Sequence, residues 1–178
     1  MTSILVWAGA SFLLLLAAGV GAYLRHIRNT LREQVSAIST KFPGAVSTSA
    51  QGAAVTNLAL RRITRAAGTR KQRTGQIYSV IASSGHLSLV RGREADIVAE
   101  FDGCQVRDVR VGTTSVLLAD YTTLFFGIAA GGTTFELPIR INGPRPTSIM
   151  TASREWAIDR GNTIVEIVRD TAARSTDD

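Results

Sequence analysis

The feature that most constrains this chain is an uncharged stretch near its N-terminus, from Ser3 to Leu24. As a helix its 22 residues would span about 33 Å, because an α-helix rises about 1.5 Å per residue. That length matches the ~30 Å hydrocarbon core of a bilayer, and glycines such as Gly9 and Gly19 are common in membrane spans. The stretch therefore predicts a transmembrane anchor over residues 1–24.

A cleaved signal peptide is the alternative interpretation of this stretch. Signal peptides begin with a basic region, whereas Met1-Thr2-Ser3 carries no basic side chain. Arginines follow the stretch at once, which is typical of a retained span with its C-terminal side in the cytoplasm. We therefore expect a single-pass plasma-membrane protein with its N-terminus outside. The residues expected at the membrane interface are Trp7, Tyr23, Arg25, Arg28 and Arg32.

The helix is predicted to continue beyond the membrane. Its apolar residues recur at intervals of three and four, which gives one apolar stripe along a helix. Two heptads are too few for a coiled coil, so a helix lying against the membrane or the protein's own domain is favoured over a self-association seam. The residues of the stripe are Leu24, Ile27, Leu31, Val35 and Ile38.

A linker and a basic segment follow this helix. Ser39–Gly52 opens with the turn signal Lys41-Phe42-Pro43-Gly44 and continues with small polar residues, which is typical of a linker. A second helix is predicted from about Ala53 to Ala67, with Val55, Leu58, Ile63 and Ala66 on one broad face. The cationic residues at its end and beyond are the candidate lipid- or partner-binding set: Arg61, Arg62, Arg65, Arg70, Lys71 and Arg73.

The positive charge is concentrated in the N-terminal part of the chain. Residues 1–73 hold ten Lys or Arg and one acid, whereas residues 74–178 hold ten Arg and thirteen acids. A nucleic-acid-binding domain more often carries its basic surface on the folded module. The basic segment also lacks a stacking platform, because no aromatic residue lies between Phe42 and Tyr78. Anionic lipid headgroups, or a purely topological role, therefore rank first for this segment, an acidic protein partner second and nucleic acid last.

From residue 75 onward the pattern predicts a small β-rich domain. Short runs of β-branched and aromatic residues alternate with glycine-containing turns. The domain organisation expected is an anchor over 1–24, a juxtamembrane helix and basic linker over 25–74, the β-rich domain over 75–174 and a disordered tail over 175–178. The predicted strands are Gln76–Ala82, His86–Arg91, Asp96–Phe101, Gln105–Val111, Ser115–Ala119, Thr122–Ala130 and Thr133–Ile141.

The most specific local prediction is a hairpin at Gly131-Gly132. Two glycines suit a tight hairpin turn because both tolerate positive φ. This turn pairs Ala130 with Thr133 and places six apolar side chains on one face: Leu124, Phe126, Ile128, Phe135, Leu137 and Ile139. Pro138 cannot donate a ladder hydrogen bond, so its strand is predicted at an edge or at a bulge.

A final helix is predicted after the Pro- and Gly-rich segment 142–146. Ser153 or Thr151 can cap its N-terminus, where Glu155 is favourable beside the positive end of the helix dipole. Gly161 lies in the middle of the helix and leaves open a division into two helices.

Seven short strands followed by a C-terminal helix resemble a bacterial membrane-anchored pleckstrin-homology-like domain. The resemblance covers roughly Gly75 to Ala173, and the run Val106–Val111 is similar to a middle strand of such domains. It implies an antiparallel sheet or partly open barrel used as a scaffold. It does not imply phosphoinositide binding, because Ser83-Ser84-Gly85-His86, between the first two strands, carries no fixed charge. Another small β-sandwich or barrel is the alternative.

The sequence contains no recognisable catalytic or metal-binding motif. His26 and His86 lie far apart, and Cys104 is the single cysteine, for which a buried or half-buried position is expected. Asp96, Glu100 and Asp102 alternate along one strand, which is more typical of a solvated face than of an acid–base pair. We therefore expect a protein without catalytic residues, metal or cofactor.

The first functional hypothesis is a membrane-tethered interaction or scaffold module that binds a partner protein or serves a membrane assembly. A peripheral module that binds anionic lipid through the basic segment is the second. An enzyme with an unrecognised site is the third, and a deep pocket with converging polar groups would favour it.

Overall fold

The protein combines three helices with a seven-stranded sheet in a computed structural model. The structure describes residues 2–69, 74–116, 119–145 and 147–174, with side chains described between residues 14 and 169 of these ranges. Its elements are α1 (Thr2–Lys41), β1 (Val46–Gln51), α2 (Ala54–Ala66), β2 (Ile77–Ser83), β3 (His86–Arg91), β4 (Asp96–Asp102), β5 (Val106–Val116), β6 (Ala119–Ala130), β7 (Thr133–Ile141) and α3 (Arg154–Arg174), with a 3₁₀ turn at Gly103–Gln105.

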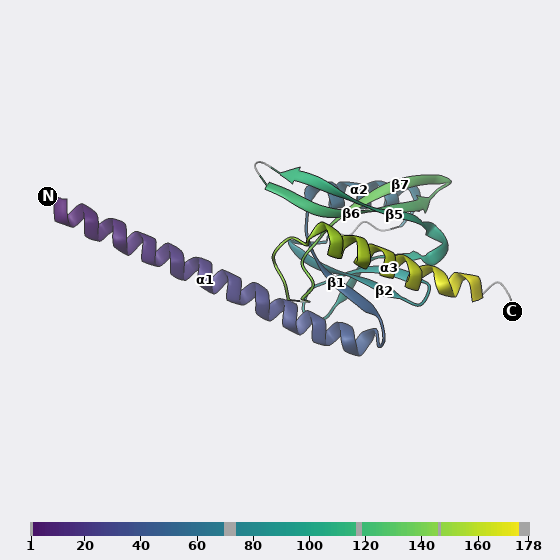
Figure 1. Ribbon diagram of the computed structural model, residues 1–178, viewed down its shortest axis with the longest axis horizontal. Helices are drawn as coiled ribbons and strands as arrows, with labels where there is room; N and C mark the ends of the chain where they lie inside the picture. The colour runs from purple at the N-terminus through teal and green to yellow at the C-terminus, as the bar shows by residue number, and fades with distance from the viewer. Residues whose placement is uncertain (1, 70–73, 117–118, 146, 175–178) are drawn as a thin grey trace.

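The seven strands form one antiparallel sheet in the order β4-β3-β2-β1-β7-β6-β5. β1 joins the two halves of this sheet. It pairs with β2 along its whole length but with β7 only at Ala50 and Gln51. Because the shared ladder is so short, the halves splay apart and face each other across the core, with α3 between them (Figure 1).

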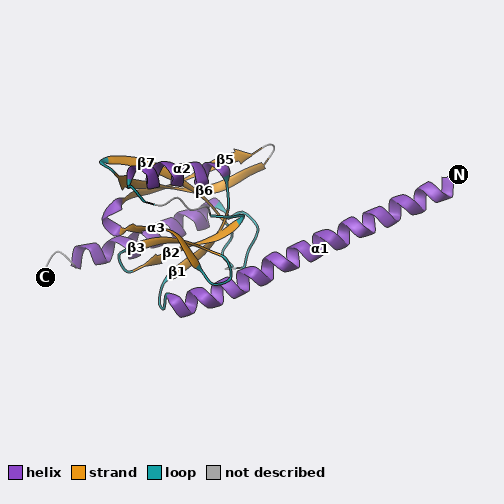
Figure 2. Ribbon diagram, turned by 180° about the vertical axis from the view of Figure 1, so that it is seen from behind, coloured by secondary structure: helices purple, strands orange, loops and turns teal. Residues whose placement is uncertain are grey.

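One large hydrophobic core lies between the two halves. It contains alternate residues of the strands, such as Tyr78, Val80 and Phe126, as the period of two in a strand requires. α2 lies along β7 and β6 (Figure 2) and inserts Leu60 and Ile63 into the core. α3 completes the core with Ala157, Ile164 and Val168.

The C-terminal part of α1 packs on the outer face of the sheet. Ile38 forms a small second cluster with Ile81, Val90 and Ala95. Gln34 is buried beside it and donates a hydrogen bond from Nε2 to the Val90 carbonyl oxygen at 3.1 Å. The stripe predicted along this helix therefore lies against the protein's own domain at Leu31 and Ile38, both of which are buried. The N-terminal half of α1 projects away from the domain (Figure 1).

The predicted membrane anchor is not supported. Among the residues that the structure describes, no helix has both the length and the apolar character needed to cross a membrane. On this finding the transmembrane anchor over 1–24, the single-pass topology and the plasma-membrane location are wrong. The predicted fold class is wrong in the same respect, because an open sheet with three helices takes the place of an anchored domain.

The strands differ from the prediction at two places. β1 lies in the segment predicted as a linker, although it is the strand that joins the two halves of the sheet. Residues 106–111 of the predicted strand Gln105–Val111 and the first two residues of the predicted strand Ser115–Ala119 lie within one continuous strand, β5, whereas Ala119 begins β6 and residues 117–118 lie outside the described residues. The number of strands therefore equals the seven that were predicted, but β1 is an additional strand and one predicted strand is not a separate element.

The hairpin at Gly131-Gly132 is confirmed. Ala130 pairs with Thr133, Ile128 with Phe135, Phe126 with Leu137 and Leu124 with Ile139, and both glycines have positive φ. Five of the six apolar side chains are buried, and Phe135 is partly buried against the core. β7 is not an edge strand, but its pairing with β1 covers only Arg140 and Ile141, so Pro138 lies beyond that ladder.

The final helix α3 is continuous. The Ser153 hydroxyl oxygen accepts a hydrogen bond from the Trp156 N–H at 3.3 Å, as predicted for a cap. Gly161 does not divide the helix. A Cβ at this position would lie 3.3 Å from Leu124 Cδ2, so the glycine lets α3 approach the sheet closely.

Candidate functional site

The outward side of α2 carries the described part of the predicted cationic set. Thr56, Ala59, Leu60 and Ile63 are the buried residues of the helix, and their spacing defines its inward side. Arg61, Arg62 and Arg65 are exposed, as the helical period requires for the opposite side. Leu58 lies on this outward side with 48% of its surface exposed, and Val55 is 42% exposed. The predicted grouping of Val55 and Leu58 with Ile63 on one face is therefore wrong.

We refer to Leu58, Arg61, Arg62 and Arg65 as the arginine face. These residues, with Ala66 and Phe135 of β7, line a surface hollow of about 440 Å³. A second hollow of about 490 Å³ lies on the other flank, lined by Arg61, Thr64, Arg65 and Thr69. The arginine face thus combines apolar and cationic side chains around one hollow.

The guanidinium groups of the arginine face have no carboxylate partner among the described residues. The described ion pairs join Arg93 to Glu33, Arg110 to Glu136 and His86 to Asp102, and none of these residues belongs to α2. Three like charges within two helical turns repel one another, so the face carries an uncompensated positive potential. Such a potential attracts a negatively charged group.

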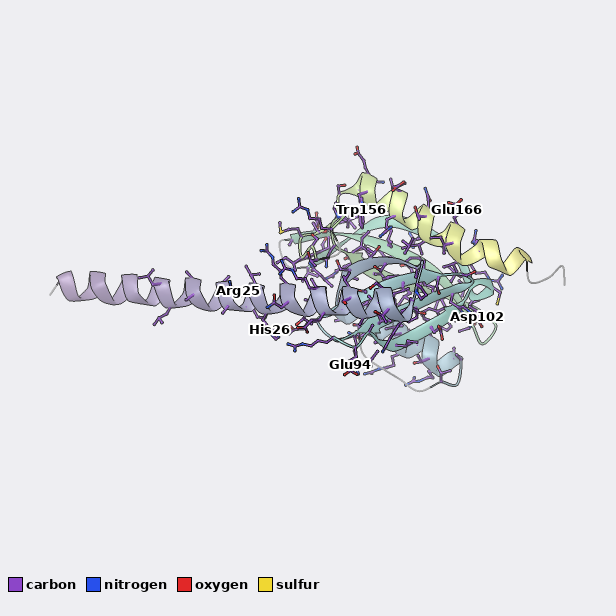
Figure 3. All side chains as sticks on the ribbon, turned by 90° about the horizontal axis from the view of Figure 1, so that it is seen from below. Arg25, His26, Glu94, Asp102, Trp156 and Glu166 are labelled. Carbon is purple, nitrogen blue, oxygen red and sulfur yellow. The ribbon has the colours of Figure 1, made fainter. Side chains whose placement is uncertain are left out.

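The remaining predicted site residues are not brought together with the arginine face. Arg70, Lys71 and Arg73 lie outside the described residues, as does the side chain of Trp7. Arg25, Arg28 and Arg32 are exposed on α1, and Figure 3 shows Arg25 near the point where this helix leaves the domain. Tyr23 does not stand alone on α1, because its hydroxyl lies 3.4 Å from Gln76 Oε1.

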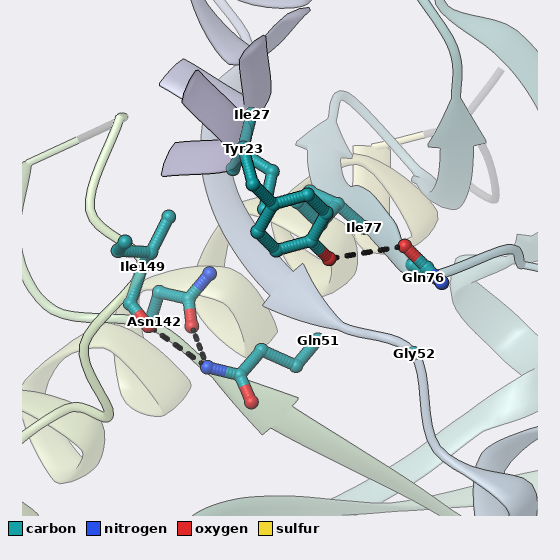
Figure 4. A pocket seen from close by; sticks show the side chains of 8 residues that line it. All are labelled: Tyr23, Ile27, Gln51, Gly52, Gln76, Ile77, Asn142 and Ile149. Atoms are coloured by element: carbon teal, nitrogen blue, oxygen red, sulfur yellow. Dashed lines mark hydrogen bonds between the residues drawn. The ribbon is translucent and has the colours of Figure 1, made fainter. Parts of the chain in front are cut away.

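The Tyr23 contact marks a crevice that the sequence did not reveal. The crevice has a volume of about 360 Å³ and lies between α1, the adjoining ends of β1 and β2, and the loop after β7 (Figure 4). Three carboxamides, from Gln51, Gln76 and Asn142, line it together with three isoleucines. We refer to it as the amide crevice. Its residues come from distant parts of the chain, so no local motif could announce it.

The acidic residues, the histidine and the cysteine considered for chemistry lie on the surface. Asp96, Glu100 and Asp102 are all exposed, as expected for a solvated face. His86 Nδ1 lies 3.3 Å from Asp102 Oδ1 in an exposed pair. Cys104 is exposed, so the buried or half-buried position predicted for it is wrong. Within the described residues no group of three His, Cys, Asp or Glu side chains could hold a metal ion.

Tyr78 is the ionisable group whose environment is most unusual. It is fully buried in the core, and its hydroxyl has no hydrogen-bond partner among the described residues. Burial raises the pKa of Tyr78 above its ordinary value, because the phenolate would lose its hydration. The phenol therefore stays neutral in the folded chain, and Tyr78 is not among the residues that line either surface site.

Comparisons with known proteins identify no relative of this chain. No family model, no characterised protein and no solved structure matches the chain. The resemblance to pleckstrin-homology-like domains therefore stays a prediction. Any functional argument has to start from the arginine face and the amide crevice themselves.

Proposed function

We propose that this chain is a non-catalytic interaction module that binds an acidic segment of a partner protein on its arginine face. One observation carries the proposal. An ordered helix presents three arginines without carboxylate partners around an exposed leucine and a partly buried phenylalanine. Arginine and aromatic residues around an apolar centre are the composition enriched where proteins meet.

The chemistry of the face selects the partner. An acidic side chain can accept hydrogen bonds from a guanidinium in a bidentate arrangement, which is stronger than a neutral hydrogen bond. An apolar side chain of the same segment can enter the hollow lined by Leu58 and Phe135. Charge steers the encounter and the apolar contact holds the complex, so association should weaken with added salt.

Anionic lipid is the second candidate for the same charges. A basic helix attracts headgroups with about 1 kcal/mol per cation near the membrane surface. The hollow beside the helix favours the protein partner, because a protruding side chain fills a hollow whereas a headgroup layer offers a broad, compliant surface. The third hypothesis, an enzyme with an unrecognised site, gains no support from these two sites, because neither lining holds a nucleophile beside a base.

The proposal can be tested with a fluorescent peptide of glutamates around one phenylalanine. We expect saturable binding that weakens with salt and drops at least about tenfold in Arg61→Glu/Arg65→Glu, because each charge-assisted hydrogen bond contributes about 1.5–3 kcal/mol. Arg107→Glu/Arg145→Glu is the matched control, since it changes the net charge equally at exposed residues away from α2. Equal loss in both variants would reduce the effect to net charge and refute the proposal.

Vesicles separate the two candidate partners. The same chain is mixed with neutral vesicles and with vesicles containing phosphatidylserine. Binding to the anionic vesicles that is lost in Arg61→Glu/Arg65→Glu, without any binding of the acidic peptide, would replace the protein partner by lipid.

A further inference from the structure

The amide crevice has the size of a small-molecule site and is built from both parts of the structure. Its volume of about 360 Å³ falls at the lower end of the range for ligand pockets, roughly 300–1,000 Å³. α1 contributes Tyr23 and Ile27, while the domain contributes the remaining residues (Figure 4). The arginine face lies on other elements, so the crevice is a separate feature of the molecule.

The floor of the crevice is held rigidly by hydrogen bonds. Gln51 Nε2 donates to Asn142 Oδ1 and to the Ile149 carbonyl oxygen, both at 3.0 Å. Asn142 is buried and donates from Nδ2 to Ser49 Oγ at 3.3 Å. Because both N–H groups of the Gln51 carboxamide are engaged, its orientation is fixed. Gln51 Oε1 remains an acceptor without a partner among the described residues.

The opposite side of the crevice offers a donor. Gln76 Oε1 faces the Tyr23 hydroxyl at 3.4 Å, which leaves the Gln76 amide N–H groups without a partner among the described residues. A ligand that satisfies both sides needs an N–H group for Gln51 and a carbonyl for Gln76. A carboxamide supplies both in one planar group.

The remaining lining residues offer no opposite charge to an ionised ligand. Ile27, Ile77 and Ile149 form the apolar walls, and Tyr23 is the single ionisable side chain among the described lining residues. A carboxylate or an ammonium would lose hydration here without gaining an opposite charge, which is costly. The walls instead suit a short aliphatic group.

We infer that the amide crevice binds a neutral carboxamide that carries a short aliphatic group, such as the amide of an apolar amino acid or peptide end. Its ligand touches α1 on one side and β1, β2 and the loop after β7 on the other. Binding therefore tightens the docking of α1 on the domain, because the ligand bonds to both parts.

The experiment is an NMR titration of the full chain with 4-methylpentanamide, a carboxamide on a short aliphatic group. The matched compound is 4-methylpentanoate, which carries a carboxylate in place of the carboxamide and has no other amide. A ligand of this size should bind with a dissociation constant on the order of 1–10 mM. We expect shifts at Gln51, Gln76 and Ile149 with the amide, and affinity at least about tenfold weaker for the carboxylate. Equal affinities, or shifts confined to residues elsewhere, would overturn the inference.

Variants separate this site from the arginine face. Gln76→Leu removes the proposed donor at an exposed position and should weaken the amide about three- to tenfold, the effect of one hydrogen bond. Tyr23→Phe keeps the ring wall and frees Gln76, so binding should be retained. Arg61→Glu/Arg65→Glu should leave the titration unchanged, which keeps this test independent of the proposed function. Unchanged affinity in Gln76→Leu, with the fold intact by circular dichroism, would contradict the inference.

Discussion

Removing the Ile38 side chain tests how α1 is attached to the domain. Ile38 is 3% exposed and packs against Ile81, Val90 and Ala95 in a cluster separate from the main core. Ile38→Ala deletes three carbon atoms, or about 2.4 kcal/mol at 0.8 kcal/mol for each, and the cavity left behind raises the expected range to about 2–5 kcal/mol. The Glu33–Arg93 ion pair at 2.9 Å cannot compensate, because both side chains are about half exposed and such pairs contribute about 0–1 kcal/mol.

The loss should appear first in α1. The cluster joins α1 to the outer face of the sheet, so its weakening opens the helix end before the main core. We expect exchange protection of the backbone amides near Gln34 and Phe42 to fall roughly 50-fold or more, the equivalent of 2.4 kcal/mol. Ser36→Ala, at an exposed position of the same helix, should change stability by less than about 0.5 kcal/mol. Unchanged protection in Ile38→Ala would refute the packing of α1 described above.

Three further substitutions probe the sheet, the core and α2. Gly52→Ala places a Cβ 1.8 Å from the Gly75 carbonyl oxygen, which is backbone, and should lower the unfolding free energy by at least about 1–3 kcal/mol in urea titrations. Above pH 10 the Tyr78 phenol stays protonated in the folded chain, because burial raises its pKa, but it ionises in the unfolded chain. The free energy of unfolding should therefore fall by up to about 1.4 kcal/mol per pH unit above pH 10, and Tyr78→Phe should lack this loss. Leu60→Ala should cost about 2–5 kcal/mol, whereas its exposed neighbour on α2, Leu58→Ala, should cost less than about 0.5 kcal/mol while weakening the acidic peptide.

The hairpin was predictable because its information is local. Gly131-Gly132 fixes the turn, the turn fixes the register, and the register places the apolar residues on one face. Turn chemistry and side-chain alternation therefore agree within about twenty residues of sequence. α2 was predictable for the same reason, and its observed bounds fall one residue inside each predicted end.

β1 could not be read from its own residues. The strand VSTSAQ has few large apolar side chains, although Thr48, Ser49 and Ala50 are buried. Its polar groups are satisfied by distant partners, since Arg160 of α3 donates to Thr48 Oγ1 and to the Ser47 carbonyl oxygen, both at 2.6 Å. Long-range pairing of this kind leaves no periodic hydrophobic signal.

The sequence predicts that a strand ends at Val111, because glycine is typical of a turn and Gly112 follows. In the structure this glycine lies within the strand, and a Cβ there would come 2.9 Å from the Phe125 ring of β6. The glycine makes room for an aromatic ring across the ladder. The sequence shows the glycine but not the ring opposite it, which depends on the register of two strands.

The ordering of α2 changes what its arginines can do. On a flexible linker, such charges would attract any polyanion and would lose conformational freedom on binding. On a helix anchored through Leu60 and Ile63, their backbone is already fixed, and Arg61 and Arg65 lie one turn apart beside Leu58. Pre-organisation of this kind reduces the entropy lost on association and ties the charges to an adjacent apolar contact. The arginine face should therefore distinguish peptides by the spacing of acidic and apolar residues, so that a scrambled peptide of equal charge binds more weakly than the designed one.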